Sequence, residues 1–383
     1  MLPFVFWFSL FCIFYAYLGY HLLLSVLSLM KQRPVAAEDM QPRVSLLLAV
    51  FNEEDSLEQK LRNCLELDYP KHLLEIVIVS DGSTDRTNAI LKDWARNHPR
   101  IKVHALEANI GKTSCLNHVL PELTGDIVLL TDSNTWLPPH TLELLLSPFA
   151  DQQVGLVTGS TYYVSPEDMH DTKNYGLSIY NRLEKLAKKL ETRTGSCVGA
   201  DGAIFALRRS LFNPLHPKDI NDFVLPLRVV RAGYRTVFVQ EAVCLEFTDK
   251  YMQSEFQRQK RITARTLRAI WSYRDLLNPL SRPLFALKLF SHKLMKFLTP
   301  FFLIIAFAAN LMLVPQSLLY AGLFFIQLVL YSLALLGYFQ EIKNYKQSMN
   351  WLPYSFAATN IAMLFGWFSF LSGRSAVTWQ PNR

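Results

Sequence analysis

Three acid-bearing segments, each directly after an apolar run, hold the residues that could do chemistry. Phe51–Asp55 reads Phe-Asn-Glu-Glu-Asp, Ser80–Asp85 reads Ser-Asp-Gly-Ser-Thr-Asp, and Thr131–Asn134 reads Thr-Asp-Ser-Asn. Carboxylates gathered at one place repel one another unless a cation or a donor-rich ligand holds them. Mg²⁺ and Mn²⁺ take oxygen ligands from a few carboxylates and from substrate phosphates. Together the three segments predict a divalent cation site that receives a nucleotide diphosphate.

Each of these segments also has a purely structural interpretation when it is taken alone. Asp55 and Ser83 are residue types that cap helices, and Asp81 followed by glycine is typical of a turn. The glycine-rich phosphate loops are absent from the sequence, since no GxGxxG follows an apolar run and no GxxxxGK[ST] occurs. This absence argues against a dinucleotide-dependent oxidoreductase and against a P-loop ATPase.

The elements that must position these segments alternate along the chain. Apolar runs of strand length occur at Val44–Val50, Leu74–Val79, Ile101–Leu106 and Ile127–Leu130. Helical patterns lie between them, at Ser56–Leu67, Asp85–Asn97 and Thr113–Leu120. This alternation predicts an α/β domain with a mostly parallel sheet that is covered by helices on both faces. Ligands bind beyond the carboxyl ends of such strands, so we expect the three acid-bearing segments to share one edge of the sheet.

A long uncharged run near the N-terminus predicts a membrane anchor. Phe4–Met30 has 27 residues without a formal charge, which corresponds to about 40 Å of helix, enough to cross a bilayer. Lys31 and Arg33 follow the run, and no Lys or Arg precedes it. Because basic residues favour the cytoplasmic side, we expect residue 31 onward in the cytoplasm and the N-terminus outside.

The C-terminal part repeats this signal. Phe297–Gln340 carries no charge over 44 residues, which suits two spans with a turn at Pro315 and Gln316, and Gln347–Gly373 suits a third span. The alternative for each run is a core helix of a soluble protein, and the length of the uncharged runs argues against it. Three spans after the domain would leave the tail from Arg374 outside.

These patterns divide the chain into three parts. We expect an N-terminal transmembrane anchor at 1–33, a cytosolic domain at 41–280, and an amphipathic interfacial helix with C-terminal transmembrane helices at 281–383. The protein would then be an integral protein of the plasma (inner) membrane with its α/β domain in the cytoplasm. A transporter is disfavoured, because the spans contain no acid and no paired broken helices.

The composition excludes several classes of protein. An apolar share of 50%, 15 Gly and 5 Cys in 383 residues exclude a disordered polar chain, a collagen-like chain and a disulfide scaffold. The cysteines are odd in number and scattered, and they lack the spacing of a zinc site. We therefore expect reduced thiols, as in the cytosol.

Positive charge is concentrated next to the C-terminal spans. The chain has a net charge of +7, yet residues 250–296 hold eleven Lys and Arg against two acids, so the rest of the chain is at −2. Such a block is typical of a cytosolic face that contacts anionic membrane lipids. The sharper alternative adds a phosphate-bearing ligand held near the membrane. No nucleic-acid-binding module accompanies the charge, so nucleic acid is not expected as a partner.

The segment from about Val44 to Ile270, with its flanking spans, resembles the family 2 glycosyltransferases. The similar branch is the membrane-embedded one that contains cellulose synthase and poly-N-acetylglucosamine synthase. Four matching motifs carry the resemblance: Val44–Glu54 as the opening strand, Ile78–Asp85 as the first aspartate motif, Asn109–Lys112 as a nucleotide-side loop, and Thr131–Asn134 as the DxD metal motif. The resemblance implies a GT-A type fold with one N-terminal and about three C-terminal transmembrane helices.

The second half of the domain continues the resemblance. Gly199–Arg209 looks like the acceptor-side loop and its following strand, although a hairpin turn with a basic end would read the same way. Asn221, Asp222 and Phe223 stand where the family has TED, whose Asp is the catalytic base. The alternative for Asp222 is a helix N-terminal acid stabilised by the helix dipole.

The resemblance implies a role for each matching residue. The implied nucleotide-sugar-binding residues are Ala49, Asn52, Glu53, Asp81, Lys112 and Asp132, and the implied metal ligands are Asp132 and Asn134. The implied acceptor-side residues are Gly199, Asp201, Gly202 and Arg258, and the implied catalytic residues are Asp222 and Arg261.

The sequence departs from the family pattern at two places. Asn134 replaces the second Asp of the metal motif, which keeps an oxygen ligand but removes one negative charge. Arg258–Ile262 replaces QxxRW, so Arg261 is retained while Ile262 stands in place of the Trp. The missing Trp argues against processive polymerisation and favours transfer of one sugar to a lipid.

The implied function is inverting transfer of a hexose or an N-acetylhexosamine from a UDP-sugar to a glycan or a lipid-linked acceptor. Asp222 would take the proton of the acceptor hydroxyl, and Mg²⁺ or Mn²⁺ with Arg261 would neutralise the leaving diphosphate. Membrane lipids are expected as further partners, and the pattern does not identify protein partners. The alternative is a catalytically inactive scaffold subunit that still binds nucleotide, and Asn134 is the feature that favours it.

Overall fold

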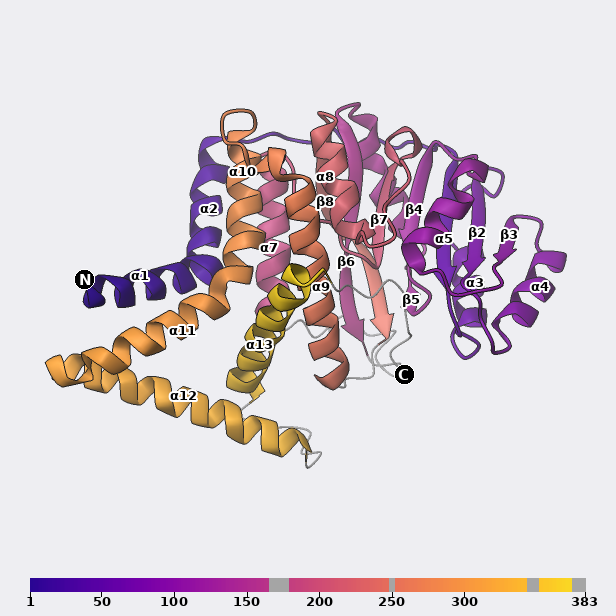
Figure 1. Ribbon diagram of the computed structural model, residues 1–383. Coiled ribbons are helices and arrows are strands. Elements are labelled where there is room, and N and C mark those ends of the chain that lie inside the picture. Colours follow the sequence, from indigo (N-terminus) through magenta and orange to yellow (C-terminus); the bar gives the residue numbers. More distant parts are fainter. Residues whose placement is uncertain (165–178, 248–251, 343–350, 374–383) are drawn as a thin grey trace. The chain divides into compact units, whose positions relative to one another are not determined.

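The computed structural model describes residues 1–164, 179–247, 252–342 and 351–373 (Figure 1). The chain forms two compact units. The sheet unit comprises the described residues of Leu24–Lys250 and Ser272–Phe285, and the helical unit comprises those of Met1–Leu23, Tyr251–Trp271 and Ala286–Ser375. Each unit is described by itself below.

The sheet unit contains one sheet, which has eight strands within the described residues and the order β3-β2-β1-β4-β7-β6-β8-β5. The strands are β1 Val44–Val50, β2 Leu74–Ser80, β3 Ile101–Ala105, β4 Ile127–Thr131, β5 Thr135–Trp136, β6 Val154–Val164, β7 Ile204–Arg208 and β8 Arg235–Phe247. Strands β1 to β4 pair in parallel, whereas β7 is antiparallel to both of its neighbours, β4 and β6. The predicted mostly parallel sheet is therefore confirmed, and its second half is mixed.

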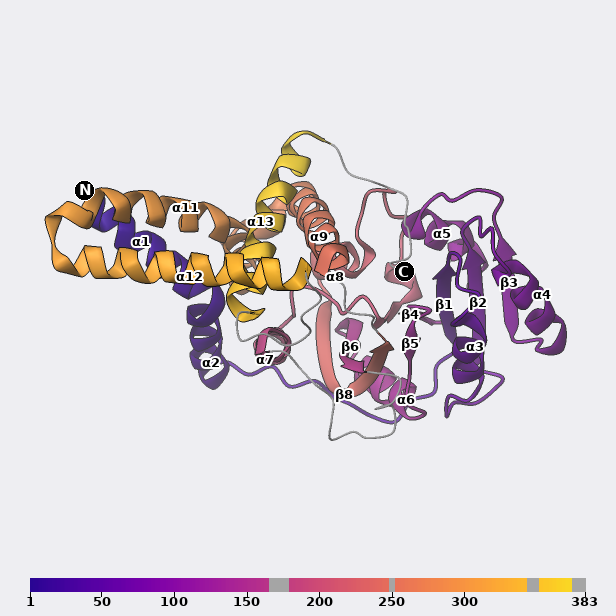
Figure 2. The ribbon, with the colours of Figure 1, turned by 90° about the horizontal axis from the view of Figure 1, so that it is seen from below.

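The strand order explains where a ligand can bind. The chain runs outward from β1 through β2 to β3 and then returns past β1 to β4. Right-handed crossovers place the helices of the outward and return paths on opposite faces. Figure 2 shows α3 (Leu57–Leu65) and α5 (Lys112–Val119) on opposite sides of β1 and β2. The strand order thus reverses between β1 and β4, and open α/β sheets bind ligands beyond the carboxyl ends of the strands at such a point.

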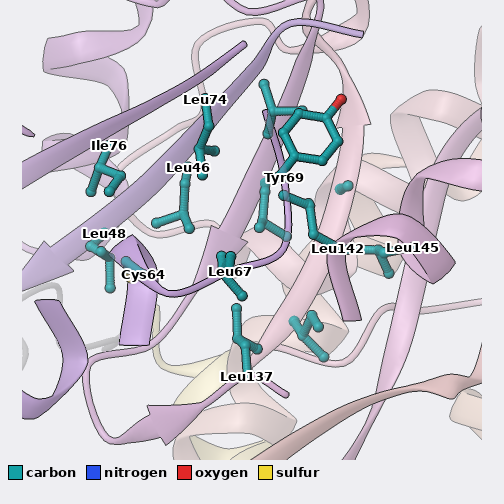
Figure 3. Packing of buried hydrophobic residues seen from close by; sticks show 14 of the residues in the cluster. Leu46, Leu48, Cys64, Leu67, Tyr69, Leu74, Ile76, Leu137, Leu142 and Leu145 are labelled. Atoms are coloured by element: carbon teal, nitrogen blue, oxygen red, sulfur yellow. The ribbon is translucent and has the colours of Figure 1, made fainter. Parts of the chain in front are cut away.

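Burial on both faces accounts for the apolar runs. All seven residues of β1 and all five of β4 are buried, as expected for strands covered by helices on both sides. Figure 3 shows Leu46 and Leu48 of β1 packing in one cluster with Leu74 and Ile76 of β2. The predicted strands and helices agree with the observed elements to within two residues at each end, and α3 differs most, since it begins at Leu57 and ends at Leu65.

Four further helices complete the sheet unit. They are α4 Thr87–Asn97, α6 Thr141–Leu146, α7 Ile179–Arg193 and α8 Asn221–Arg231. The long strands β6 and β8 run parallel to each other, and β7 lies between β4 and β6 (Figure 1). All five cysteines are buried, and no disulfide joins them.

At the amino ends of the parallel strands, Glu75 ties neighbouring strands together. Its carboxylate accepts hydrogen bonds from Lys102 Nζ at 2.6 Å, from the Thr124 backbone at 2.7 Å, and from Ser45 Oγ. Burial alone would raise the pKa of Glu75, but these hydrogen bonds lower it to about 2. A carboxylate with a depressed pKa stabilises the fold at neutral pH.

Replacing Glu75 with Gln is therefore expected to lower the free energy of unfolding at pH 7 by about 1 to 2 kcal/mol. Because the pKa falls from an ordinary 4.5 to about 2 on folding, the contribution is complete above pH 4.5. It is lost as the pH falls from 4.5 through 2. Thermal unfolding of detergent-solubilised protein at several pH values measures the difference. The exposed Glu107, replaced by Gln, is the control, and equal losses in both variants would contradict the prediction.

The described α-helices that lie mainly in the helical unit are α1 Leu2–Phe14, α9 Met252–Ser272, α11 Met295–Leu313, α12 Leu318–Ile342 and α13 Trp351–Leu371. Two further helices, α2 Tyr20–Met30 and α10 Pro283–Leu289, have residues in both units. Within the described part of the chain, four segments are long and apolar enough to cross a membrane: Leu2–Met30, Pro283–Gln316, Leu318–Gln340 and Leu352–Leu371. The number of predicted spans is thus confirmed, and a short turn at Val314–Gln316 separates α11 from α12 as predicted. The start of the third predicted C-terminal span, before residue 351, and the tail from Arg374 lie outside the described residues.

Polar side chains within the helical unit pair with one another. The Tyr15 hydroxyl lies 2.7 Å from Ser291 Oγ, and Asn310 Nδ2 donates to Gln327 Oε1 at 2.9 Å. Trp367 Nε1 donates to the Phe297 carbonyl at 2.8 Å. Such pairs satisfy polar groups between apolar helices, where water is scarce.

Candidate functional site

The loops that follow β1 and β2 are fastened to each other at the carboxyl edge. Asn52 has a left-handed backbone with φ of 52°, which asparagine tolerates better than most residues. Its Oδ1 accepts a hydrogen bond from the Thr84 backbone at 2.8 Å, and its own N–H donates to Ser83 Oγ at 3.1 Å. The Glu53 N–H donates to Thr87 Oγ1 at 2.8 Å. Ser83 thus bonds to the neighbouring loop, and the predicted nucleotide-side residues Asn52 and Glu53 form part of one rigid edge.

Asp81 supports the loop that leads into α5. Its side chain is 1% exposed, and its two oxygens accept hydrogen bonds from the backbone N–H groups of Ile110 at 2.7 Å and Gly111 at 2.9 Å. Gly111 has a φ of 88°, a conformation that favours glycine. Asp81 therefore holds the start of α5, at Lys112, in place. The predicted Ala49 is a buried residue of β1.

Lys112 lies among carboxylates from three separate elements. It is the first residue of α5, and its Nζ forms an ion pair with Asp132 Oδ1, just after β4. Burial would lower the pKa of Lys112, but the charges of Asp132, Asp222 and Glu246 raise it overall. The structure therefore brings Lys112 into contact with Asp132, and the charge of Asp222 acts on the same ammonium.

Glu246 was not predicted as a site residue. It lies on β8 and accepts a hydrogen bond from Asn134 Nδ2 at 3.3 Å. The antiparallel pairing of β5 with β8 places Thr135 opposite Glu246, and this pairing joins residues more than a hundred positions apart. An acid within the otherwise apolar end of β8 was the available signal.

The oxygen atoms of this edge suit a hard divalent cation. Asp132, Asn134 and Glu246 offer carboxylate and amide oxygens, which are the ligands that Mg²⁺ and Mn²⁺ prefer. Among the residues the structure describes, no group of three His, Cys, Asp or Glu side chains is arranged to hold a metal by itself. The residues therefore fit a cation that takes one or two protein carboxylates and completes its shell with substrate phosphates and water.

Asp222 presents an unsatisfied carboxylate oxygen. It lies in the first turn of α8, and its Oδ1 is buried without a hydrogen-bond partner in the described structure. Burial raises the pKa of Asp222, the charges of Asp132 and Asp201 raise it further, and Lys112 and Lys188 oppose them. Buried polar atoms are almost always paired, so the unpaired oxygen marks a place for a ligand donor.

The turn that contains the predicted acceptor-side residues packs against Asp222. Asp201 is fixed to β6, because Thr161 Oγ1 donates to its Oδ1 at 2.7 Å and the Thr161 N–H donates to its Oδ2 at 3.1 Å. The Ala200 N–H donates to the Asp222 carbonyl at 2.8 Å. A Cβ atom on Gly202 would lie 2.7 Å from Asp222 Oδ2. Gly199 to Gly202 thus form the wall beside this carboxylate.

Two lysines of α7 also approach this wall and were not predicted. Lys185 Nζ lies 3.3 Å from the centre of the Tyr162 ring and has no hydrogen-bond partner among the described residues. Burial lowers the pKa of Lys185 to about 8, with Lys188 adding to the effect and Asp201 opposing it. Lysines on the buried side of an amphipathic helix were the available signal.

The structure places Arg258 and Arg261 on α9, in the helical unit. Arg258 forms an ion pair with Glu255 at 3.2 Å. Arg261 is partly exposed, and burial together with the charge of Arg258 lowers its pKa. Their predicted roles toward the acceptor and the diphosphate remain predictions.

Known proteins resemble parts of this chain. A probable glycosyltransferase of Bacillus subtilis, YdaM, is 29% identical over 54% of this chain and 50% of its own length. A beta-monoglucosyldiacylglycerol synthase of Synechocystis is 35% identical over 34% of this chain and 30% of its own length. A poly-beta-1,6-N-acetyl-D-glucosamine synthase of Staphylococcus epidermidis is 33% identical over 30% of this chain and 28% of its own length. The matches thus span half or less of these relatives.

One solved structure resembles nearly the whole chain. A mannosyltransferase of Pyrobaculum calidifontis, solved with GDP-Man and Mn²⁺, has a TM-score of 0.73 and 23% sequence identity. The likeness covers 98% of this chain and 100% of that one, and it confirms the GT-A type fold with apolar helices at both ends.

The family follows from a match to a family model. Residues 45–215, which contain all the loops of the parallel half of the sheet and the turn beside Asp222, match the model described as glycosyl transferase family 2. Poly-beta-1,6-N-acetyl-D-glucosamine synthases are among the homologues. Residues 45–215 of this chain are therefore similar to glycosyl transferase family 2.

Proposed function

We propose that this chain is an inverting glycosyltransferase of the cytosolic membrane face. It moves a hexose or an N-acetylhexosamine from a UDP-sugar to a hydroxyl of a glycan or a lipid-linked acceptor. The observation that carries the proposal is the buried, unpaired Oδ1 of Asp222 in the same sheet unit as the Lys112 and Asp132 pair. One carboxylate is thus free to take a proton while others surround a cation.

In the proposed reaction, the acceptor hydroxyl oxygen bonds to the anomeric carbon as the bond from that carbon to the diphosphate oxygen breaks. The hydroxyl proton goes to Asp222, and the electron pair of the broken bond stays on the nucleoside diphosphate. A base with a raised pKa holds the transferred proton better, and the lone pair of Oδ1 is available for it. Lys112 would contact the departing phosphate.

Asp132 and Asn134, joined by Glu246, would hold Mg²⁺ or Mn²⁺. The bound ion would supply a Lewis acid that neutralises charge on the diphosphate. Asn52, Glu53 and Asp81 shape the nucleotide side of the site through their hydrogen bonds to neighbouring loops. Arg261 is proposed as a guanidinium partner of the same diphosphate.

The proposed donor and acceptor follow from relatives. Two named relatives make a glucosyl lipid and an N-acetylglucosamine polymer, and the Pyrobaculum structure contains GDP-Man with Mn²⁺. These names support a sugar nucleotide, a divalent cation and an acceptor that is a lipid or a glycan. We propose 1–33 and 281–383 as the membrane parts and 41–280 as the cytosolic catalytic part, which would bring the site close to lipid acceptors.

The test is release of nucleoside diphosphate by detergent-solubilised protein. A panel of UDP- and GDP-sugars is offered with Mg²⁺ or Mn²⁺, with diacylglycerol or N-acetylglucosamine oligomers as acceptors. Release with one donor that requires the metal supports the proposal and names the sugar. Tight nucleotide binding with no release under any acceptor would instead support the inactive scaffold.

A second prediction concerns the wall beside the proposed base. Replacing Gly202 with Ala puts a Cβ atom 2.7 Å from Asp222 Oδ2, so the carboxylate must shift. A displacement on the order of 1 Å at a reacting group lowers turnover by about 10²-fold. A Cβ atom on Gly322 would meet no other atom within 4 Å, so Gly322→Ala is the matched control. Equal kcat values for the two variants would contradict this account of Gly202.

A further inference from the structure

Helix α3 buries two polar side chains on the side that faces the turn at residues 131–135, called here the metal-motif turn. Lys60 is 2% exposed and Asn63 is 3% exposed. They lie three residues apart, which places them on one face of the helix. Their apolar neighbours Leu61 and Cys64 are fully buried. Burying an ammonium costs free energy unless its hydrogen bonds are made, so Lys60 needs a structural account.

All three donors of the Lys60 ammonium are used. Its Nζ donates to Thr131 Oγ1 at 3.1 Å, to Thr135 Oγ1 at 2.8 Å and to the Thr135 carbonyl at 3.0 Å. Each acceptor is neutral, and no carboxylate pairs with Lys60 in the described part of the chain. A buried positive charge is therefore held by the two ends of the turn that contains Asp132.

Thr135 connects Lys60 to the backbone of the turn. Its Oγ1 donates to the Asp132 carbonyl at 2.7 Å and lies 3.0 Å from Thr131 Oγ1. The hydrogen bonds thus run from Lys60 through Thr135 to the backbone of Asp132. Helix α3 therefore holds the turn from one side, and Lys112 of α5 contacts it from the other.

Asn63 fixes the next part of the same segment. Its Nδ2 donates to the Leu137 carbonyl at 2.7 Å, and its Oδ1 accepts from the Leu137 N–H at 2.9 Å. A side-chain amide that satisfies both backbone groups of one residue substitutes for a strand partner. Lys60 and Asn63 together make five hydrogen bonds to residues 131–137.

We propose that Lys60 and Asn63 form a polar clamp that positions the metal-motif turn for binding a divalent cation and a nucleoside diphosphate. The inference rests on the proposed function and adds two positioning residues to it. The clamp holds Asp132 and Asn134 in the geometry that brings them to Lys112 and Glu246. The Lys60 charge behind the turn also offsets repulsion between the carboxylates in front of it.

The choice of a lysine here argues for this role. Replacing both partners of a buried polar contact by apolar groups is often neutral for the fold, whereas removing one partner leaves the other without its hydrogen bonds. Lys60→Met keeps the length of the side chain and removes its charge and donors. We expect it to leave the sheet unit folded and to loosen residues 131–137 alone.

Three variants and two controls test the clamp. Lys60→Met, Asn63→Leu and Thr135→Val each remove part of it, whereas Thr135→Ser keeps the hydroxyl. Asn117→Leu is the matched control, because Asn117 makes the same two bonds to the backbone of Leu215, at 2.7 and 2.8 Å, away from this turn.

The first measurement is amide hydrogen exchange, which does not depend on activity. We expect faster exchange at residues 131–137 in the three clamp variants, and in Asn117→Leu faster exchange only near residue 215. The second measurement is Mn²⁺ binding by electron paramagnetic resonance, with UDP or GDP present. Loss of supporting hydrogen bonds around a metal ligand weakens metal affinity by about 10- to 100-fold. Thr135→Ser and Asn117→Leu should stay within about twofold of wild type, well below that range.

The turnover assay separates positioning from chemistry. Saturating Mn²⁺ should restore most of kcat in the clamp variants, because Asp222 is untouched. Normal exchange and normal Mn²⁺ affinity in Lys60→Met and Thr135→Val would overturn the inference, as would an equal loss in Asn117→Leu. If wild-type protein binds no Mn²⁺ with either nucleotide, the proposed function fails and the positioning of a metal fails with it. Exchange then still decides whether the clamp fixes the turn.

Discussion

Asp222→Asn is expected to lower turnover by about 10²- to 10⁴-fold while nucleotide affinity stays close to that of wild type. The amide has the size of the carboxylate but cannot take the proton of the acceptor hydroxyl. Oδ1 of Asp222 is the buried oxygen without a partner, so the substitution removes an acceptor that no described protein group uses. Steady-state release of nucleoside diphosphate and equilibrium nucleotide binding measure the two quantities.

The pH dependence of the wild-type rate gives a second view of the same residue. Burial and the neighbouring carboxylates raise the pKa of Asp222 above its ordinary 3.8. A base works only when it is unprotonated, so the rate should rise with pH as Asp222 loses its proton. This rise is the acidic limb of the pH–rate profile, and we expect its midpoint at a higher pH than for an ordinary aspartate. Asp222→Asn should lack the limb in whatever residual rate it keeps.

Asp219→Asn is the matched control for this substitution. Asp219 lies three residues earlier, and its Oδ2 accepts a hydrogen bond from the His216 backbone at 3.0 Å, which an amide oxygen can also accept. The control should therefore keep wild-type turnover. Wild-type turnover in Asp222→Asn, or an equal loss in Asp219→Asn, would show that Asp222 is not the base.

Local sequence was enough to predict the parallel half of the sheet. Strands β1 and β4 are buried along their whole length, so burial on both faces produces apolar runs that the sequence displays directly. The acid-bearing loops follow those runs at once, and parallel strands bring their carboxyl ends to one edge. Asp132 and Lys112 therefore come together as the order of elements implies.

The remaining site residues depend on contacts that no local pattern records. Glu246 reaches Asn134 only because β8 pairs antiparallel with β5, after the chain has crossed the sheet twice. Lys60 and Asn63 lie on the apolar face of α3, where helical spacing alone assigns core residues. Their function appears only when the turn that they contact is known. The Gly202 wall likewise follows from packing of a turn on the first turn of α8.

Asp132→Asn is expected to lower turnover by about 10²- to 10³-fold, because a bound cation contributes several kcal/mol of charge stabilisation. Asn134 has an amide where the resembling family has a second acid, so Asp132 would be the remaining charged ligand of this turn. The half-saturating Mn²⁺ concentration should rise in the same variant. A Mn²⁺ titration of nucleoside diphosphate release measures both effects. Unchanged Mn²⁺ dependence would exclude Asp132 as a ligand.

Lys112→Met removes the ammonium and so tests its contribution separately from that of the proposed metal ion. Lys112 lowers the pKa of Asp222, so its removal should raise that pKa and move the acidic limb of the rate profile to higher pH. Mn²⁺ should still be required, because Asp132 keeps its charge. Lys112 and Asp132 form an ion pair, so their effects on turnover should not be independent. The double variant Lys112→Met/Asp132→Asn should lose less activation free energy than the sum of the two single variants. A limb that stays in place or moves to lower pH would contradict the effect of Lys112 on Asp222. Strictly additive losses would mean that Lys112 and Asp132 act independently of each other.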